Sequence, residues 1–163
     1  MKRKKKLYIK TVLAVSILLC IFLSCATVTP REEATRRGFA AMRARNFDIA
    51  VDEFTEAIRL EPNRAASYSS RGNAYTELGE FELALADFNT AIAIQPERGW
   101  TPFPYYYRGL MYEKWGDYEN AILDLEYALR IIAGDPTYDN FRPTIRNDLE
   151  RIRRFWRIEN PNL

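Results

Sequence analysis

The side chains best suited to chemistry in this sequence are carboxylates that recur along the chain. Paired carboxylates whose pKa values differ can serve as general acid and general base. The acidic residues in question are Asp52, Glu53, Glu56, Asp87 and Asp124. Asp52, Asp87 and Asp124 each fall in one of three similar segments, so we interpret them as part of a repeat and not as a catalytic dyad. We expect all five carboxylates to face solvent on the second helix of each segment.

Other residue types that support catalysis or bind metals are scarce. The chain has no histidine, which removes the commonest general base and metal ligand at neutral pH. Its two cysteines, Cys20 and Cys25, both lie in an N-terminal segment that we expect to be removed or modified. Gly72 and Gly79 lie too far apart to form a glycine-rich phosphate loop. We therefore expect neither an enzyme nor a metal or cofactor site.

The N-terminal segment has the features of a secretory signal. Six basic residues precede an apolar run, Val12–Leu23, that is shorter than the ~20 residues of a membrane-spanning helix. The run ends in Phe22-Leu23-Ser24-Cys25-Ala26, which resembles a bacterial lipobox, although the family usually has leucine in place of Phe22. The resemblance implies a signal peptide over residues 1–24 and acylation of Cys25, as in a palmitate-bearing lipoprotein.

A short tether, residues 25–30, would then hold the folded part against a membrane. The absence of aspartate after Cys25 resembles the sorting pattern for the outer membrane of diderm bacteria, so we expect a lipid-anchored protein of the cell envelope that faces the periplasm. Two alternatives remain open. The first is cleavage after Ala26 by an ordinary signal peptidase, and the second is an uncleaved anchor in the inner membrane that begins near Leu7.

The net charge argues against nucleic acid as a partner. The whole sequence carries 24 Lys and Arg against 22 Asp and Glu. Six of those bases lie in the signal, and their removal leaves 18 against 22, a net charge near −4. With Cys20 removed and Cys25 acylated, no thiol remains for a disulfide.

Three segments of the chain repeat the same landmarks. Each opens with Arg-Gly and then places small and large apolar residues at matching offsets. Gly38 and Gly72 are 34 residues apart, and Gly109 follows after 37, the extra length falling at the irregular insert Gly99–Pro104. The other shared landmarks are Ala41, Ala50, Phe54, Ala57 and Pro62; Tyr75, Ala84, Phe88, Ala91 and Pro96; and Tyr112, Ala121, Leu125, Ala128 and Pro136. Such a period is typical of a stacked repeat architecture.

Period and landmarks together resemble the tetratricopeptide repeat (TPR) family, whose unit is two antiparallel helices. The resemblance implies an all-α fold: an antiparallel helix-pair solenoid of three TPR units plus a C-terminal capping helix. The units span residues 31–64, 65–98 and 102–135. The first departs from the family at Ala34 and Ala41, and the third at Leu125 and Ala133.

The small residues have a steric role in this reading. We expect Gly72 and Ala91 to lie where the helices of one repeat cross those of the next, with Tyr75, Phe81 and Phe88 filling the space beside them. The small side chains at these positions let the backbones of the crossing helices approach each other.

Turns between the paired helices also have a sequence signal. Gly79 and Gly116 can adopt a left-handed conformation without steric cost. In the first copy Arg45 stands at that place, and we expect the neighbouring Asn46 to absorb the turn. Pro62 and Pro96 follow the second helices and stop them.

The C-terminal segment breaks the repeat and predicts a helix over residues 140–158. One face is apolar and carries Phe141, Ile145, Leu149, Ile152 and Trp156. The opposite face is basic and carries Arg146, Arg151, Arg153, Arg154 and Arg157. Pro143 suits the first turn. Because a repeat stack needs a polar end, we interpret this helix as a cap; an arginine face that meets anionic lipid or an acidic partner is the alternative.

In the TPR family the first helices line a concave groove that holds a peptide. Carried over position by position, the resemblance implies a groove that contains Phe39, Met42, Arg43, Ser69, Asn73, Thr76, Glu77, Phe103, Tyr106, Leu110 and Glu113. Packing of Phe39, Phe103 and Leu110 against neighbouring repeats is the alternative for those three. Chaperone-binding members hold a C-terminal carboxylate with lysines, asparagines and an arginine. The corresponding positions here are Thr35, Phe39, Ser70, Phe103 and Tyr107, so we do not expect that ligand class.

These observations predict a membrane-anchored adaptor or scaffold lipoprotein that binds a peptide or protein partner in the cell envelope, within an assembly, secretion or envelope-maintenance complex. The alternative is a self-associating structural protein that makes its contacts through its outer surface or its arginine-rich last helix. Neither reading involves nucleic acid or a metal.

Overall fold

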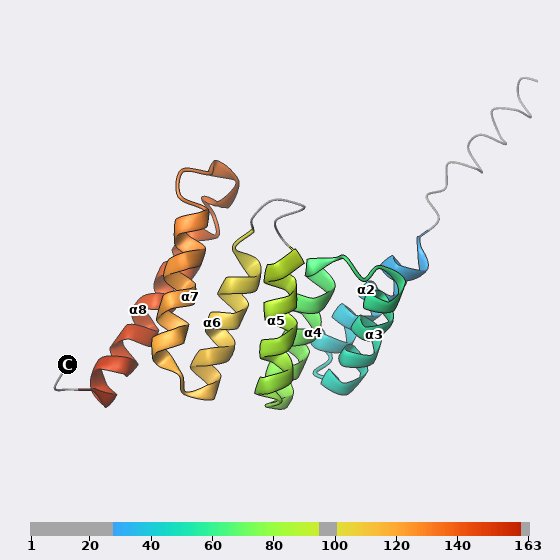
Figure 1. Ribbon diagram of the computed structural model, residues 1–163, viewed down its shortest axis with the longest axis horizontal. Coiled ribbons are helices and arrows are strands. Elements are labelled where there is room, and N and C mark those ends of the chain that lie inside the picture. Colours follow the sequence, from blue (N-terminus) through green and yellow to red (C-terminus); the bar gives the residue numbers. More distant parts are fainter. Residues whose placement is uncertain (1–27, 95–100, 161–163) are drawn as a thin grey trace, which may run out of the picture.

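The computed structural model describes residues 28–94 and 101–160 of the chain. Within these residues six helices of nearly equal length form three antiparallel pairs, and a seventh longer helix follows (Figure 1). The pairs are α2 (Pro30–Arg43) with α3 (Phe47–Leu60), α4 (Ala65–Leu78) with α5 (Phe81–Ile94), and α6 (Phe103–Trp115) with α7 (Tyr118–Ile131). A short 3-10 turn, η2 (Pro136–Tyr138), leads into α8 (Arg142–Glu159).

Each helix packs against the next in chain order, so the helices stand in one row from α2 to α8 (Figure 1). The predicted all-α helix-pair solenoid with its C-terminal cap is therefore confirmed. Among the described helices, none combines the length and apolar character that crossing a bilayer requires. The predicted signal, Cys25 and Pro96 lie outside the described residues.

The glycine of each first helix gives room to its own partner helix. A β-carbon on Gly72 would lie 3.1 Å from the Phe88 ring and 3.3 Å from the Ala84 carbonyl oxygen, both on α5. One on Gly38 would lie 2.6 Å from the Phe54 ring. The prediction that Gly72 lies where the helices of one repeat cross those of the next was therefore wrong. The close crossing lies within a pair, because the large ring of the second helix sits directly on the glycine.

The turns inside the pairs follow the glycine pattern, with one difference. Gly79 and Gly116 have positive φ angles of 81° and 88°. In the first pair Arg45 itself takes φ 60°, while Asn46 has φ −90°, so the expectation that Asn46 absorbs the turn was wrong. The turn geometry fixes which position must be left-handed, and the residue there adopts it whatever its type.

Two of the carboxylates expected in solvent are buried. Asp87 is 5% exposed and Asp124 is 7% exposed. Each accepts two hydrogen bonds from an arginine of the preceding helix, Arg71 and Arg108 respectively, at 2.7–2.8 Å. The expectation was wrong because these arginines directly precede the close-crossing glycines and reach across the narrow gap between paired helices.

The same arginines also bond the repeat before their own. Arg71 donates to the Thr55 hydroxyl at 3.1 Å, and Arg108 donates to the Asn89 side chain. Glu126 stands at the equivalent place on α7 and accepts a 2.6 Å hydrogen bond from Arg153 of α8. One line of polar contacts thus joins all three repeats to the last helix.

Helix α8 occupies the place that the first helix of a fourth repeat would take. Its Ile145, Leu149 and Ile152 are buried in one cluster with Leu125 of α7. Pro143 lies in its first turn, as expected. Ile152 packs on the preceding helix pair as Ala74 of α4 and Met111 of α6 do. Two residues before Ala74 and Met111 the chain has Gly72 and Gly109. Two residues before Ile152 it has Glu150. A charged residue thus stands in α8 where the first helices of the repeats have glycine.

Some arginines on the basic face of α8 form ion pairs and others do not. Arg151 pairs with Glu113 and with Asp148, and Arg153 pairs with Glu126 and Glu150. These two arginines therefore hold the cap in place, whereas Arg154 and Arg157 form no ion pair with any described residue.

Candidate binding groove

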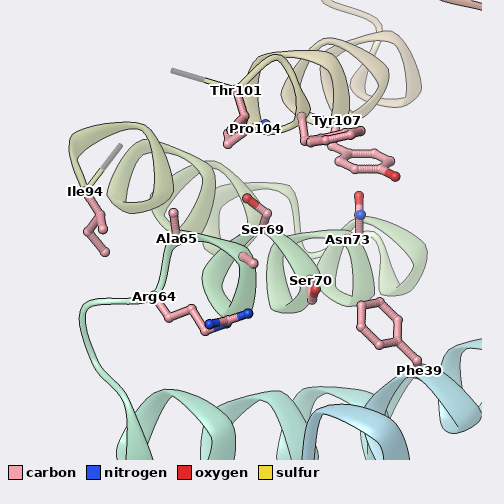
Figure 2. Close-up of a pocket in the computed structure, with 12 residues that line it drawn as sticks. Phe39, Arg64, Ala65, Ser69, Ser70, Asn73, Ile94, Thr101, Pro104 and Tyr107 are labelled. Carbon is pink, nitrogen blue, oxygen red and sulfur yellow. The ribbon is translucent and has the colours of Figure 1, made fainter. Parts of the chain in front are cut away.

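The first helices line a hollow of about 410 Å³ between the first and third pairs. It contains four of the predicted groove residues, namely Phe39, Ser69, Asn73 and Phe103. Figure 2 shows the Asn73 amide between the rings of Phe39 and Tyr107. An apolar wall therefore stands on each side of a side chain that can both donate and accept a hydrogen bond.

A second hollow, of about 340 Å³, adjoins the first, since Asn73 and Tyr107 line both. It brings together six predicted residues: Met42, Asn73, Thr76, Glu77, Leu110 and Glu113. The two hollows form one groove across α2, α4 and α6, which we call the concave groove.

Two of the predicted residues do not line the concave groove. Tyr106 is 7% exposed, and its hydroxyl donates a 2.8 Å hydrogen bond to Asp148 of α8. Its ring lies 5.0 Å from that of Phe141. The prediction for Tyr106 was wrong because α8 covers that side of α6, and the neighbouring Tyr107 faces the groove instead. Arg43 is exposed at the end of α2 and borders neither hollow.

Phe39 and Phe103 remain open to solvent. Phe39 is 45% exposed, although its ring packs edge-on against Phe54 at 5.2 Å within its own pair. Phe103 is 40% exposed, with Tyr107 at 6.4 Å and Phe141 at 5.3 Å between ring centroids. Each ring is thus fixed on one face by its neighbours and offers the other face to a ligand. Packing against neighbours and exposure to the groove were predicted as alternatives for Phe39 and Phe103, and the structure shows both for each residue.

Charges in the concave groove are largely paired. Lys114 binds Glu77 at 2.6 Å between α6 and α4, and Arg151 binds Glu113. In the larger hollow Arg64 is the one charged residue among the described residues of the lining, and it lies 3.9 Å from Glu61. The groove therefore presents little free charge to a ligand.

Two hydroxyls of the lining differ in how they are satisfied. Thr76 donates a 2.8 Å hydrogen bond to the Gly72 carbonyl oxygen within α4. The Ser69 oxygen is buried and has no hydrogen-bond partner among the described residues. An unmet buried hydroxyl has a cost of desolvation, so Ser69 would gain from a polar atom brought close by a small rearrangement.

Burial also changes the acidity of the tyrosines beneath the groove. Desolvation raises the pKa of Tyr105 to about 12, with a contribution from the Tyr127 hydroxyl. Desolvation, and then the hydrogen bond to Asp148, raises the pKa of Tyr106. Both hydroxyls stay protonated at physiological pH, and Tyr106 therefore remains the donor that ties α6 to α8.

Several lining residues were not in the predicted set. Tyr107 and Ser70, which stand where chaperone-binding members of the family have carboxylate-binding residues, both line the larger hollow. Tyr107 follows Phe103 by one helical turn, a signal that was available in the sequence. Ile94 is the last residue of α5, Thr101 precedes α6, and Pro104 lies in the first turn of α6, so helical periodicity gives little signal for these positions. In the described part of the chain, no cluster of acidic residues, cysteine or histidine could hold a metal ion.

Family models place two of the repeats. Two models, both described as tetratricopeptide repeat, match residues 65–98 and 104–135. The chain therefore contains TPR repeats, which typically serve protein–protein interaction and not catalysis. No curated protein sequence matches this chain.

Solved structures share the fold. The TPR2B domain of yeast Sti1, in a complex with pHsp70, is 26% identical with a TM-score of 0.67, over 77% of this chain and 97% of that one. The Arabidopsis OM64 TPR domain is 28% identical with a TM-score of 0.56, over 72% and 94%. The Yersinia enterocolitica type III secretion chaperone SycD, in complex with a peptide of the translocator YopD, is 16% identical with a TM-score of 0.64, over 75% and 91%.

Proposed function

We propose that this chain of tetratricopeptide repeats is a membrane-anchored adaptor that holds an extended segment of a protein partner in its concave groove. The observation that carries the proposal is the Asn73 amide placed between two partly exposed aromatic rings, those of Phe39 and Tyr107. A ligand site of this kind combines apolar walls with a few polar groups that fix orientation.

The lining indicates which kind of segment fits. Aromatic walls accept bulky apolar side chains, which are common anchors at interfaces. The Asn73 amide suits the backbone of an extended peptide, to which it can both donate and accept. Arg64 is the one charge that the described residues bring to the larger hollow, and Glu61 lies 3.9 Å from it, so a segment rich in acidic side chains or a free carboxylate gains little there. The proposed partner segment is therefore extended, apolar and internal to its protein.

The membrane part of the proposal rests on the sequence. Cys25 would carry acyl chains, each buried CH₂ adding ~0.8 kcal/mol of membrane affinity. The tether of residues 25–30 spans at most about 3.3–3.6 Å per residue, which keeps α2 close to the bilayer. The proposed location is the periplasmic face of the outer membrane, with an uncleaved inner-membrane anchor as the alternative.

Site-specific photo-crosslinking in the native envelope tests the proposal. A photoreactive residue at Tyr107 should capture a defined partner, and one at Ile49, 53% exposed on α3, should not. Adding Asn73→Ala should reduce the Tyr107 adduct while leaving the helical circular dichroism unchanged. Adducts that form equally from positions 107 and 49, or whose yield does not change with Asn73→Ala, would show that the concave groove is not the site.

A further inference from the structure

The last turns of α8 expose apolar side chains at the end of the solenoid. Ile158 is 74% exposed and Phe155 is 48% exposed, and Leu123 on the adjoining α7 is 56% exposed. A hollow of about 290 Å³ lies between Leu123 and Trp156, and Glu119 and Arg157 also border it. Ile145, Leu149 and Ile152 fill the buried contact with α7, and Phe155 lies at its edge, with its ring centroid 6.5 Å from that of Tyr118. We call Leu123, Phe155, Trp156 and Ile158 the end patch.

Two arginines in the same turns of α8, Arg154 and Arg157, have no acidic partner among the described residues. Arg157 makes no hydrogen bond or ion pair with any described residue, and Arg154 donates only a 3.4 Å hydrogen bond to the Glu150 carbonyl oxygen. Their neighbours Arg151 and Arg153 are paired with glutamates of α6 and α7. The end patch therefore joins exposed apolar side chains to two arginines that form no ion pair with the described part of the chain, although Glu119 borders the same hollow as Arg157.

A second copy of the chain fits this surface poorly. In a two-fold contact through α8, Arg154 and Arg157 would approach the same arginines of the other copy. Continuation of the stack by another helix pair is opposed by Glu150, which stands where a close-packed first helix has glycine. An occupant with negative charge and an apolar interior meets neither obstacle.

We infer that the end patch docks on an anionic phospholipid surface, with Phe155, Trp156 and Ile158 at the level of the headgroups and Arg154 and Arg157 on lipid phosphates. Aromatic and apolar side chains beside arginine are the composition of helix segments that lie in a membrane interface. The inference rests on the proposed lipid anchor, which would raise the local concentration of the patch at the bilayer. Because α2 and α8 stand at opposite ends of the row (Figure 1), contact at both ends would lay the solenoid along the membrane.

Tryptophan fluorescence in the full-length lipidated protein tests the docking. With Trp100→Phe and Trp115→Phe, the remaining indole of Trp156 reports the end patch alone. The protein is placed in phosphatidylcholine vesicles with and without phosphatidylglycerol, and quenching by brominated acyl chains is measured. Quenching should occur with the anionic vesicles and decrease in high salt. Arg154→Glu and Arg157→Glu should weaken the docked state at least about fivefold each, because each change removes a positive charge and adds a negative one. Arg59→Glu with Arg130→Glu is the charge-matched control, and it should leave quenching unchanged.

The outcomes separate this inference from the anchor. Absence of quenching with anionic vesicles overturns the docking, whether or not the protein floats with them. Equal quenching in neutral and anionic vesicles overturns the role of the arginines. If Trp156 becomes protected from aqueous iodide as the protein concentration rises, without lipid, the occupant is a second copy of the chain and the lipid docking is overturned. If protection requires another protein to be added, the occupant is that protein. Flotation with neutral vesicles tests the anchor by itself.

Discussion

Arg71 donates two hydrogen bonds of 2.8 Å to Asp87, from Nε and Nη2 to the two carboxylate oxygens. The residues are sixteen positions apart on paired helices, and Arg108 and Asp124 repeat the arrangement one unit later. Arg37 and Glu53 have the same spacing with a single bond of 2.9 Å at the surface. The same relationship therefore occurs twice in a buried setting and once in an exposed one.

Loss of one member of a buried pair should be costly. Arg71→Ala leaves the Asp87 carboxylate buried without its partner, and we expect the free energy of unfolding to fall by about 2–4 kcal/mol. The Arg71→Ala/Asp87→Ala double variant should lose less than the sum of the single variants. Arg37→Ala is the matched control and should cost at most about 1 kcal/mol, because the pair is exposed. Urea unfolding of all variants gives the comparison, and equal losses at both pairs would contradict it.

The glycine at a helix crossing should not accept a larger side chain. Gly38→Val places a β-carbon within 2.6 Å of the Phe54 ring, and overpacking of this kind costs about 1–3 kcal/mol. Ala40→Val, on the exposed side of the same helix, should cost only about 0.5 kcal/mol through helix propensity. Thermal unfolding followed by circular dichroism measures both. A Gly38→Val variant as stable as Ala40→Val would show that the two helices are not in close contact.

The left-handed Arg45 offers a stabilising substitution. Arg45→Gly should raise the free energy of unfolding by up to about 1 kcal/mol, since a non-glycine residue in this conformation costs roughly 1–2 kcal/mol and part of the gain is lost to chain entropy. The guanidinium also lies 5.4 Å from the Phe47 ring, so Arg45→Ala is measured as a control for that contact. In chemical denaturation the Arg45→Gly variant should be more stable than the unaltered protein, and the unaltered protein more stable than Arg45→Ala. Glycine ranking below alanine would exclude the strain.

Alkaline pH should weaken the fold through its buried tyrosines. Burial raises the pKa of Tyr105 from 10.0 to about 12, so the folded state holds this proton more tightly than the unfolded chain. Its contribution to stability is complete below pH 10 and is lost as the pH rises through 12. The urea midpoint should fall over this window, and less steeply in Tyr105→Phe. An identical pH dependence in both proteins would assign the loss to other groups.

Periodicity predicted the helix pairs because spacing alone determines which face of a helix is apolar. Landmarks chosen for their size did not reveal the arginine–acid pairs, although the sixteen-residue interval from Arg71 to Asp87 was present in the sequence. The choice between Tyr106 and Tyr107 could not be made in this way. Both sit near the same helix face, and α8 decides between them by covering Tyr106, from a position set by irregular connections such as the one that contains η2.

The central claim is that a partner segment lies in the concave groove, and its binding constant tests this most directly. The segment crosslinked from Tyr107 is made as a synthetic peptide and titrated calorimetrically into the chain and its variants. Tyr107→Ala and Asn73→Ala should each weaken binding by about tenfold or more, as at interface positions that dominate affinity, while Ile49→Ala on the outer surface should have no effect. Equal affinity for all three variants and the unaltered chain would contradict the account.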